Sequence, residues 1–218
     1  MTLTVPPFES DFKDRRYKGV LFDLDGVLVD ACEWHYEALN RALKQVCGYE
    51  ISREEHESTF NALTSHQKLQ ILSDRGDIDI MLSGKVWQLK QDLTIRVIKE
   101  KAEPDELKIK LLCWLREHGY KIGCVTNSVK QSARLMLELT GQLEYLDILV
   151  TNSDVIHPKP AAEAYIKAMV HLSLEPKDVL IVEDTDKGAQ AAAAACADCM
   201  RVKNGTEVTL ENLLKELA

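Results

Sequence analysis

The alternation of apolar and polar positions divides most of the chain into short strands and amphipathic helices. Continuous apolar runs predict buried strands, the first ending at Asp23 and the later ones covering residues 121–126, 147–150, 179–182 and 200–203. Helical spacing predicts the intervening helices at residues 107–117, 129–139, 161–172 and 187–195. Strands that alternate with helices imply right-handed crossovers, so the sequence predicts an α/β fold with a parallel sheet flanked by helices.

The segment between the first strand and Pro104 has a different pattern, with helical signals and no convincing strand. Amphipathic spacing covers residues 33–46 and 78–100, Ser52 opens a short helix, and Thr64 or Ser65 can cap another. Placed after the first strand, such a block can act as a lid. We therefore predict a polar tail at residues 1–17, a core at 18–30 and 104–218, and an inserted α-helical cap at 31–103.

Composition limits the possible partners. The 218 residues are 45% hydrophobic and carry a formal net charge of -8, which argues against binding to a nucleic-acid backbone. No apolar run is long enough to span a membrane, and residues 1–17 do not resemble a secretory signal, so we expect a cytoplasmic protein without membrane partners. Cys196 and Cys199 have CxxC spacing without a second pair, so we interpret them as ordinary thiols. The oligomeric state stays open.

Two aspartates follow the first predicted strand. Asp23 and Asp25 are separated by one residue, and Gly26 indicates that the strand is breaking into a loop there. Close carboxylates repel and need a cation, and oxygen ligands of this kind suit Mg²⁺ better than zinc. The alternative is a strand end that carries two solvated acids.

Polar residues also follow the later strands, at what should be the same edge of the sheet. Thr126, Asn127 and Ser128 can bind an oxyanion or simply cap the next helix. Lys159 lies between two prolines that stiffen its loop. Its ammonium can be fixed there to offset the charge of a phosphate, or it can be a solvated surface charge. Glu183-Asp184 supplies a second acidic pair. Together these residues predict a site for a metal and a phosphate.

These motifs resemble, in order, those of the haloacid dehalogenase superfamily of phosphotransferases. The matching positions are Asp23-Leu24-Asp25-Gly26, Thr126, Lys159 and Glu183-Asp184. The helical block resembles the cap of the β-phosphoglucomutase-like branch, which implies a Rossmann-like core. The resemblance implies that Asp23 is the nucleophile that forms an aspartyl-phosphate and that Asp25 is the general acid and base.

The resemblance also implies roles for the remaining motif residues. Thr126 would hydrogen-bond the transferring phosphoryl group, and Lys159 would hold that group together with the nucleophile. Asn127 would orient the substrate or a loop. The ligands of the implied Mg²⁺ would be Asp23, the backbone carbonyl of Asp25, Glu183 and Asp184, with Asp184 the surer of the acidic pair.

The expected reaction is hydrolysis of a small phosphorylated metabolite, such as a sugar or polyol phosphate. The chief alternative is a sugar phosphomutase, because residues 33–36 resemble the mutase stretch, including His35. His35 would then couple closure of the cap to substrate binding. The alternative is a structural histidine whose hydrogen bonds are satisfied at an interface between helices. Residues 62–68 lack the arginine with which the mutase pattern holds a second phosphate, and this favours hydrolysis.

Other outcomes depend on the cap. The residues expected to bind substrate there are Thr64, Ser65 and His66, and these three together with Lys68 are the candidates for setting specificity. The aldehyde-forming phosphonate hydrolases use a cap lysine as a Schiff base, for which Lys68, Lys85 and Lys90 are the candidates. A catalytically inactive binding module is a further alternative, but it predicts erosion of the motif residues, all of which are present.

Overall fold

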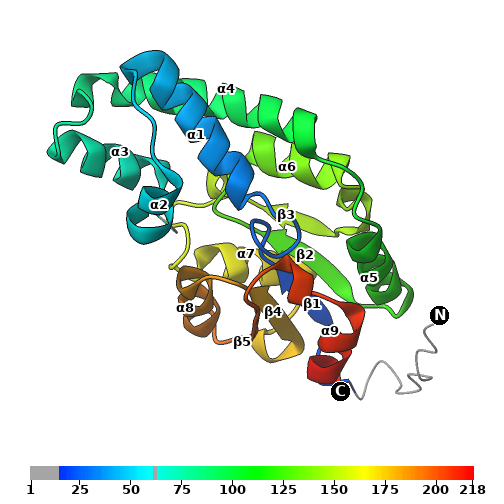
Figure 1. Ribbon diagram of the computed structural model, residues 1–218. Coiled ribbons are helices and arrows are strands. Elements are labelled where there is room, and N and C mark those ends of the chain that lie inside the picture. The colour runs from blue at the N-terminus through cyan, green and yellow to red at the C-terminus, as the bar shows by residue number, and fades with distance from the viewer. Residues whose placement is uncertain (1–14, 61–62) are drawn as a thin grey trace.

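The fold is built on a five-stranded parallel sheet with helices on both faces (Figure 1). The computed structural model describes residues 15–60 and 63–218, so most of the predicted tail lies outside it. The strand order is β3-β2-β1-β4-β5. The strands are β1 (Gly19–Phe22), β2 (Lys121–Val125), β3 (Ile148–Val150), β4 (Val179–Glu183) and β5 (Asp198–Arg201).

Successive residues of the central strands point to opposite faces of the sheet, and both faces are covered. Val20 and Phe22 of β1 are buried in one apolar cluster, whereas Leu21 is buried in another. The first cluster includes residues of α5 (Glu106–Glu117), α6 (Lys130–Leu139) and α9 (Leu210–Leu217), and the second includes residues of α7 (Glu163–Leu172) and α8 (Asp186–Ala194). Strands buried on both faces explain the continuous apolar runs of the sequence.

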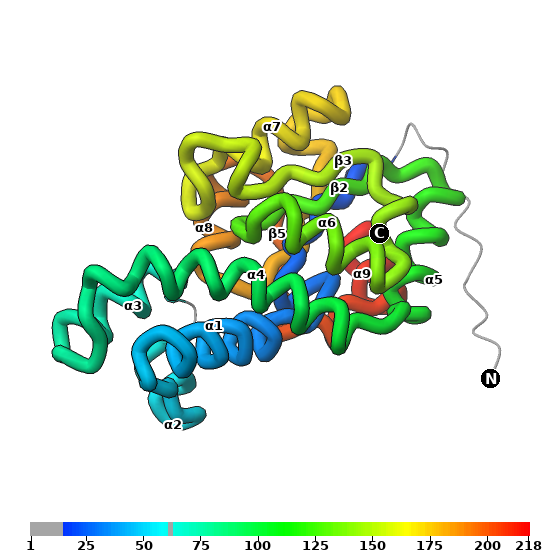
Figure 2. The backbone as a smooth tube through the Cα atoms, turned by 90° about the horizontal axis from the view of Figure 1, so that it is seen from above, coloured from blue at the N-terminus to red at the C-terminus, as the bar shows by residue number. Residues whose placement is uncertain are grey.

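A separate group of helices occupies the segment predicted as the cap and has its own apolar core. The cap contains α1 (Cys32–Cys47), α2 (Arg53–Glu55), α3 (Ser65–Asp74) and α4 (Ser83–Lys101). A π-helical segment, η1 (His56–Phe60), follows α2, and a 3-10 turn, η2 (Ile80–Leu82), precedes α4. Figure 2 shows α1 and α4 lying side by side and extending away from the sheet. Leu39, Leu43, Leu69 and Leu72 are among the residues buried between the cap helices.

Local sequence signals set several cap boundaries. Thr64 and Gln67 form the capping box that begins α3, and the Ser52 hydroxyl accepts a hydrogen bond from the Glu55 amide. Gly48 ends α1 in a left-handed conformation with φ of 68°. The remaining 3-10 turns are Leu143–Tyr145, Asn152–Asp154, Pro176–Asp178 and Gly205–Glu207. The helix caps predicted at Ser52 and Thr64 are confirmed by the structure.

Two sequence predictions were wrong in detail, and one helix was not predicted. The last strand, predicted at residues 200–203, is β5 at Asp198–Arg201, an edge strand whose partial exposure weakens the apolar pattern. The helix predicted at 78–100 is divided, because η2 precedes the α-helical part. Helix α9 was not predicted, although Thr209 caps it and its buried Leu213 and Leu217 are four residues apart.

The topology brings several strand ends to one place. The chain passes from β1 outward to β2 and β3 and then crosses to β4 on the other side of β1. Ligand sites of open parallel sheets lie at the carboxyl ends of strands where the order switches in this way. The ends of β1, β2 and β4 therefore define the region in which to seek the site.

Among the described residues, no helix is both long and apolar enough to cross a membrane.

The separate cap core predicts a large effect of one buried truncation. Replacing Leu43, which is fully buried, by alanine should lower the free energy of unfolding by about 2–5 kcal/mol, because the substitution leaves a cavity. Met81, in the same group of helices, is exposed, so Met81→Ala should change the free energy of unfolding by less than about 0.5 kcal/mol. Urea denaturation measures both values, and equal effects of the two substitutions would contradict the assignment of the cap core.

Candidate active site

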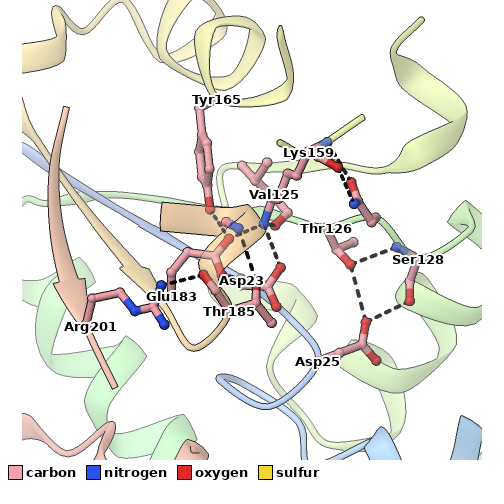
Figure 3. Close-up of polar contacts among 12 residues, drawn as sticks. Asp23, Asp25, Val125, Thr126, Ser128, Lys159, Tyr165, Glu183, Thr185 and Arg201 are labelled. Atoms are coloured by element: carbon pink, nitrogen blue, oxygen red, sulfur yellow. Dashed lines mark hydrogen bonds and ion pairs between the residues drawn. The ribbon is translucent and has the colours of Figure 1, made fainter. Parts of the chain in front are cut away.

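Asp23, Thr126 and Glu183 converge at the carboxyl edge of the sheet (Figure 3). Asp23 follows β1 and donates its backbone amide to the carbonyl of Val182, at 3.0 Å. Thr126 follows β2 and donates its amide to the carbonyl of Val150, at 2.9 Å, while Glu183 is the last residue of β4. The sheet's backbone ladder thus continues into the site and fixes the positions of these side chains.

Lys159 is the cation around which the site is organised. Its Nζ donates hydrogen bonds to Asp23 Oδ1 at 2.6 Å, to Glu183 Oε1 at 2.5 Å and to the carbonyl of Val125 at 2.7 Å. The lysine side chain is 4% exposed. Asn127 binds the Lys159 backbone twice, because its side-chain amide donates to the carbonyl and accepts from the amide, each at 3.0 Å. The loop after β2 therefore holds the lysine loop in place.

The charges of this cluster shift its protonation equilibria. Burial raises the pKa of Asp23 well above its ordinary value, and Glu183 and Asp25 add to this, whereas the Lys159 ammonium opposes it. Burial alone would lower the pKa of Lys159, but the two carboxylates that it touches raise it overall. The lysine thus stays charged, and any further cation near Asp23 would favour its carboxylate form.

Glu183 is fully buried and depends on its neighbours for polar contacts. The Tyr165 hydroxyl, from α7, donates to Glu183 Oε1 at 2.6 Å, and the Lys159 ammonium lies 4.8 Å from the centre of the tyrosine ring. Gly188, in the first turn of α8, packs directly on the carboxylate, because a Cβ there would overlap it. A glycine at this position lets the helix approach the charged cluster.

Asp25 has a different set of partners from Asp23. Its Oδ2 accepts hydrogen bonds from the Ser128 hydroxyl at 2.7 Å and, more weakly, from the Thr126 hydroxyl at 3.4 Å (Figure 3). Its Oδ1 lies 2.9 Å from Nε2 of His35 in the cap. Burial acts to raise the pKa of Asp25, but His35 and the Ser128 hydrogen bond outweigh it and lower the pKa.

The contact between Asp25 and His35 continues into the cap. Lys90 Nζ lies 3.3 Å from His35 Nδ1, and because an ammonium can only donate, Nδ1 accepts and Nε2 carries the hydrogen toward Asp25. Burial lowers the pKa of Lys90 to about 8, although Asp25 opposes the shift. Helices α1 and α4 thus reach the same carboxylate through one chain of contacts.

Three carboxylates can hold a metal ion at this edge. One oxygen each of Asp23, Glu183 and Asp184 lies within 4.8 Å of the other two. Asp184 Oδ1 is buried and has no hydrogen-bond partner among the described residues, and burial together with Glu183 raises the pKa of Asp184 to about 6. Gly26, with φ of 86°, lies against the Asp184 carboxylate, where a Cβ would overlap it. A set of hard oxygens with one unpaired member fits a cation such as Mg²⁺.

The loop that carries Asp184 is braced from β5. The Arg201 guanidinium donates to the carbonyl oxygens of Thr185 and Asp184, at 2.5 and 2.9 Å, and pairs with Asp186 at 3.2 Å. These bonds fix the backbone from the Asp184 carbonyl to Asp186 and so limit where the Asp184 carboxylate can point.

The structure brings the predicted core residues together and leaves most predicted cap residues apart. The residues that meet at the strand ends are Asp23, Asp25, Thr126, Asn127, Lys159, Glu183 and Asp184, and they are joined by His35 from the cap. The Thr64 side chain forms the N-terminal capping box of α3. The exposed His66 stacks on Trp87, with ring centres 5.8 Å apart. No described contact joins Thr64, Ser65 or His66 to the core residues.

Four residues make contacts that hold the site and that the sequence did not predict. The sequence places Ser128 in a loop that can bind an oxyanion, but it does not predict the bond from Ser128 to Asp25. It names Lys90 as a candidate Schiff-base lysine but does not distinguish it from Lys85, which the structure shows to be exposed. Tyr165 and Arg201 were not considered. For Tyr165, the local signal is a tyrosine placed among small apolar residues of α7. Arg201 has no local signal, because it lies 17 positions beyond Asp184 and reaches it only through the pairing of β5 with β4.

The bond between Tyr165 and the buried Glu183 predicts a measurable stability loss. Tyr165→Phe should lower the free energy of unfolding by about 1–3 kcal/mol, because a buried carboxylate loses a donor. Tyr145, whose hydroxyl has no hydrogen bond among the described residues, supplies the matched control, and Tyr145→Phe should be nearly neutral. Chemical denaturation of both variants tests this, and a neutral Tyr165→Phe would show that the hydroxyl does not support Glu183.

Comparison with known proteins adds family evidence to this geometry. Residues 20–202 match the family model described as haloacid dehalogenase-like hydrolase. The chain is 28% identical over 172 residues to pyrophosphatase PpaX of Bacillus velezensis, covering 78% of this chain and 76% of that protein. It is 29% identical over 185 residues to phosphoglycolate phosphatase of Nitrosospira multiformis, covering 82% and 79%.

A solved structure supports the same fold. The crystal structure of CbbY from Rhodobacter sphaeroides in complex with phosphate matches with a TM-score of 0.75 and 19% identity, and the match covers 85% of each chain. The family model spans most of this chain, including every core motif residue. The chain therefore belongs to the haloacid dehalogenase-like hydrolase family and is a phosphatase of that family.

Proposed function

We propose that this phosphatase hydrolyses a small phosphomonoester through an aspartyl-phosphate on Asp23. The observation that carries the proposal is the unequal environment of two aspartates that are two residues apart. Asp23 lies against the buried Lys159 ammonium, whereas Asp25 faces the Ser128 hydroxyl and the His35 imidazole. One carboxylate is thus placed to attack phosphorus and the other to move protons.

The two steps need Asp25 in both protonation states. In the first, an Asp23 oxygen bonds to phosphorus, the bond to the leaving oxygen breaks, and Asp25 protonates that oxygen. In the second, Asp25 takes a proton from water, which attacks phosphorus and releases phosphate from Asp23. The contacts of Asp25 lower its pKa before substrate binds. A bound phosphate dianion would raise it, since a nearby like charge disfavours the carboxylate form.

The remaining core residues would hold the phosphoryl group. Lys159 would offset the charge of the phosphoryl oxygens beside Asp23, and the Thr126 hydroxyl would donate to one of them. We assign Mg²⁺ to Asp23, the backbone carbonyl of Asp25, Glu183 and Asp184. Glu183 Oε1 is already bonded to Lys159 and Tyr165, so the unpaired Asp184 is the stronger ligand of that pair. When bound, the ion would offset negative charge on the transferring oxygens.

The cap and the loop after β2 would bind the rest of the substrate. We assign this role to His35, Thr64, Ser65, His66 and Asn127, with cap closure excluding water from the phosphoryl group. Polar side chains of this kind suit a sugar or polyol phosphate, and the phosphoglycolate phosphatase relative is named for a small phosphorylated substrate as well. We propose residues 31–103 as the cap and a cytoplasmic location for the enzyme.

Replacement of the nucleophile tests the reaction. Asp23→Asn should lower kcat by roughly a thousandfold or more, because an amide does not form the acyl phosphate. Asp30→Asn alters an exposed aspartate nearby and should retain activity within about twofold. Phosphate release from a panel of sugar, polyol and aryl phosphates with MgCl₂ measures both, with circular dichroism to confirm folding. Full activity of Asp23→Asn would remove Asp23 from its role, and no turnover by wild type would refute hydrolysis.

The raised pKa of Asp184 predicts how metal binding depends on pH. Below about pH 6 this carboxyl is protonated in the metal-free protein, so the proton competes with the cation and the stabilisation by Mg²⁺ should decline. Thermal unfolding with and without MgCl₂ at pH 5 and pH 8 should therefore show the larger increase in Tm at pH 8. Asp184→Asn should abolish the increase at both values. An equal increase at the two pH values would contradict the assignment.

A further inference from the structure

Arg201, on β5, holds the loop that follows β4 (Figure 3). One guanidinium nitrogen donates to the carbonyl oxygen of Thr185 at 2.5 Å, and the other donates to that of Asp184 at 2.9 Å. The second nitrogen also pairs with Asp186 at 3.2 Å, but the Asp186 side chain is 92% exposed, so water screens this ion pair. The two bonds to carbonyl oxygens are therefore the part of the contact that holds the loop.

The Asp184 carboxylate depends on this backbone for its position. Its Oδ1 is buried and has no hydrogen-bond partner in the part of the chain that the structure describes, so no described side chain holds this oxygen. Gly26, in the loop after β1, packs against the carboxylate and excludes other positions without bonding to it. A bond that fixes the main chain at Asp184 therefore also fixes the oxygen that a metal ion would use.

The sheet supplies the rigidity that Arg201 passes on to the loop. Arg201 is the last residue of β5 and lies opposite Glu183 in the ladder between β5 and β4. The amide of Val202 donates to the Glu183 carbonyl at 2.9 Å, so the main chain on both sides of this pair is fixed. The arginine side chain then holds Asp184 and Thr185, which extends the strand pairing beyond the end of the ladder.

We propose that Arg201 is a positioning residue for Mg²⁺, because its forked guanidinium holds Asp184 where the ion can bind. This proposal rests on the proposed function, which assigns the ion to Asp184. Mg²⁺ requires a nearly ideal octahedral set of oxygens at about 2.0–2.1 Å. A ligand that is held in advance avoids the cost of ordering it on binding, so the arginine raises the affinity for Mg²⁺ without touching the ion or the substrate.

The charge of Arg201 acts in the opposite direction to this positioning effect. A guanidinium near a cation site repels the ion, so loss of the charge alone would strengthen Mg²⁺ binding. Loss of a contact that positions a ligand would instead weaken Mg²⁺ binding. The sign of the change on removing Arg201 therefore separates positioning from electrostatic repulsion.

Two substitutions of Arg201 test the proposal. Arg201→Met removes the guanidinium and should raise the Kd for Mg²⁺ about tenfold or more, as is usual when a residue that orients a metal ligand is lost. Arg201→Lys keeps the charge but carries its donors on a single nitrogen, so its Kd should rise as well. The dependence of Tm on the MgCl₂ concentration, without substrate, measures each Kd. A Kd equal to or below the wild-type value in either variant would overturn the proposal.

A second arginine provides the matched control. Arg116 is exposed and donates to the Glu144 carbonyl at 2.7 Å, so it forms the same kind of bond. It lies near the end of α5 that leads into β2, at the edge of the sheet opposite the site. Arg116→Met should therefore leave the Kd for Mg²⁺ unchanged within about twofold. A rise equal to that of Arg201→Met would show that loss of any such bond has this effect and would overturn the proposal.

Ca²⁺ gives a readout that a general loss of stability would not change. This ion accepts about six to eight oxygens in a more flexible arrangement, so a loosened loop should weaken its binding by less than about threefold. The preference of the site for Mg²⁺ over Ca²⁺ should therefore fall at least about threefold in Arg201→Met. Equal losses of affinity for the two ions would contradict a positioning role that is specific to Mg²⁺.

These binding measurements separate the proposal from the proposed reaction. If wild type hydrolyses nothing but Arg201→Met weakens Mg²⁺ binding as expected, the reaction is wrong and the role of Arg201 stands. If Asp184→Asn abolishes the stabilisation by Mg²⁺ while Arg201→Met leaves it unchanged, the metal assignment stands and the role of Arg201 is refuted. If MgCl₂ does not raise the Tm of wild type, the metal assignment and the role of Arg201 both fail.

Discussion

The site depends on one buried ammonium held between two carboxylates from neighbouring strands. Lys159 joins Asp23, after β1, to Glu183, at the end of β4, and it also binds the carbonyl of Val125 at the end of β2. Isolated, any of these buried charges would be costly, so each requires the others. Asn127 and Tyr165 fix the cluster from the loop after β2 and from α7. The contacts that offset the cost of burying these charges also place the proposed nucleophile, Asp23, beside a fixed positive charge.

Asp25 gives the cap a direct connection to the chemistry. It is two residues from Asp23, yet its partners are hydroxyls of the core and, through His35 and Lys90, two helices of the cap. Movement of the cap relative to the core would change these contacts and hence the proton affinity of Asp25. Proton transfer and enclosure of the substrate would thus involve the same carboxylate.

The sequence predicted those parts of the molecule that leave a local pattern. Strands buried on both faces produce apolar runs, and the polar residues that end them share one edge, so Asp23, Thr126 and Glu183 could be grouped before their positions were known. The edge strand β5 was displaced in the prediction because it is partly exposed. Contacts between distant segments, such as Arg201 with the Asp184 loop, depend on strand pairing and have no local signal.

The proposed reaction requires Asp23 to carry the phosphoryl group during turnover. Quenching the wild-type enzyme during turnover of its best substrate and reducing it with borohydride converts an acyl phosphate to homoserine, which peptide mass spectrometry can locate. If Asp23 is the nucleophile, homoserine should be found at position 23, dependent on substrate and absent from the Asp23→Asn variant. Reduction at another carboxylate, or no reduction when single-turnover kinetics show an accumulated intermediate, would contradict it.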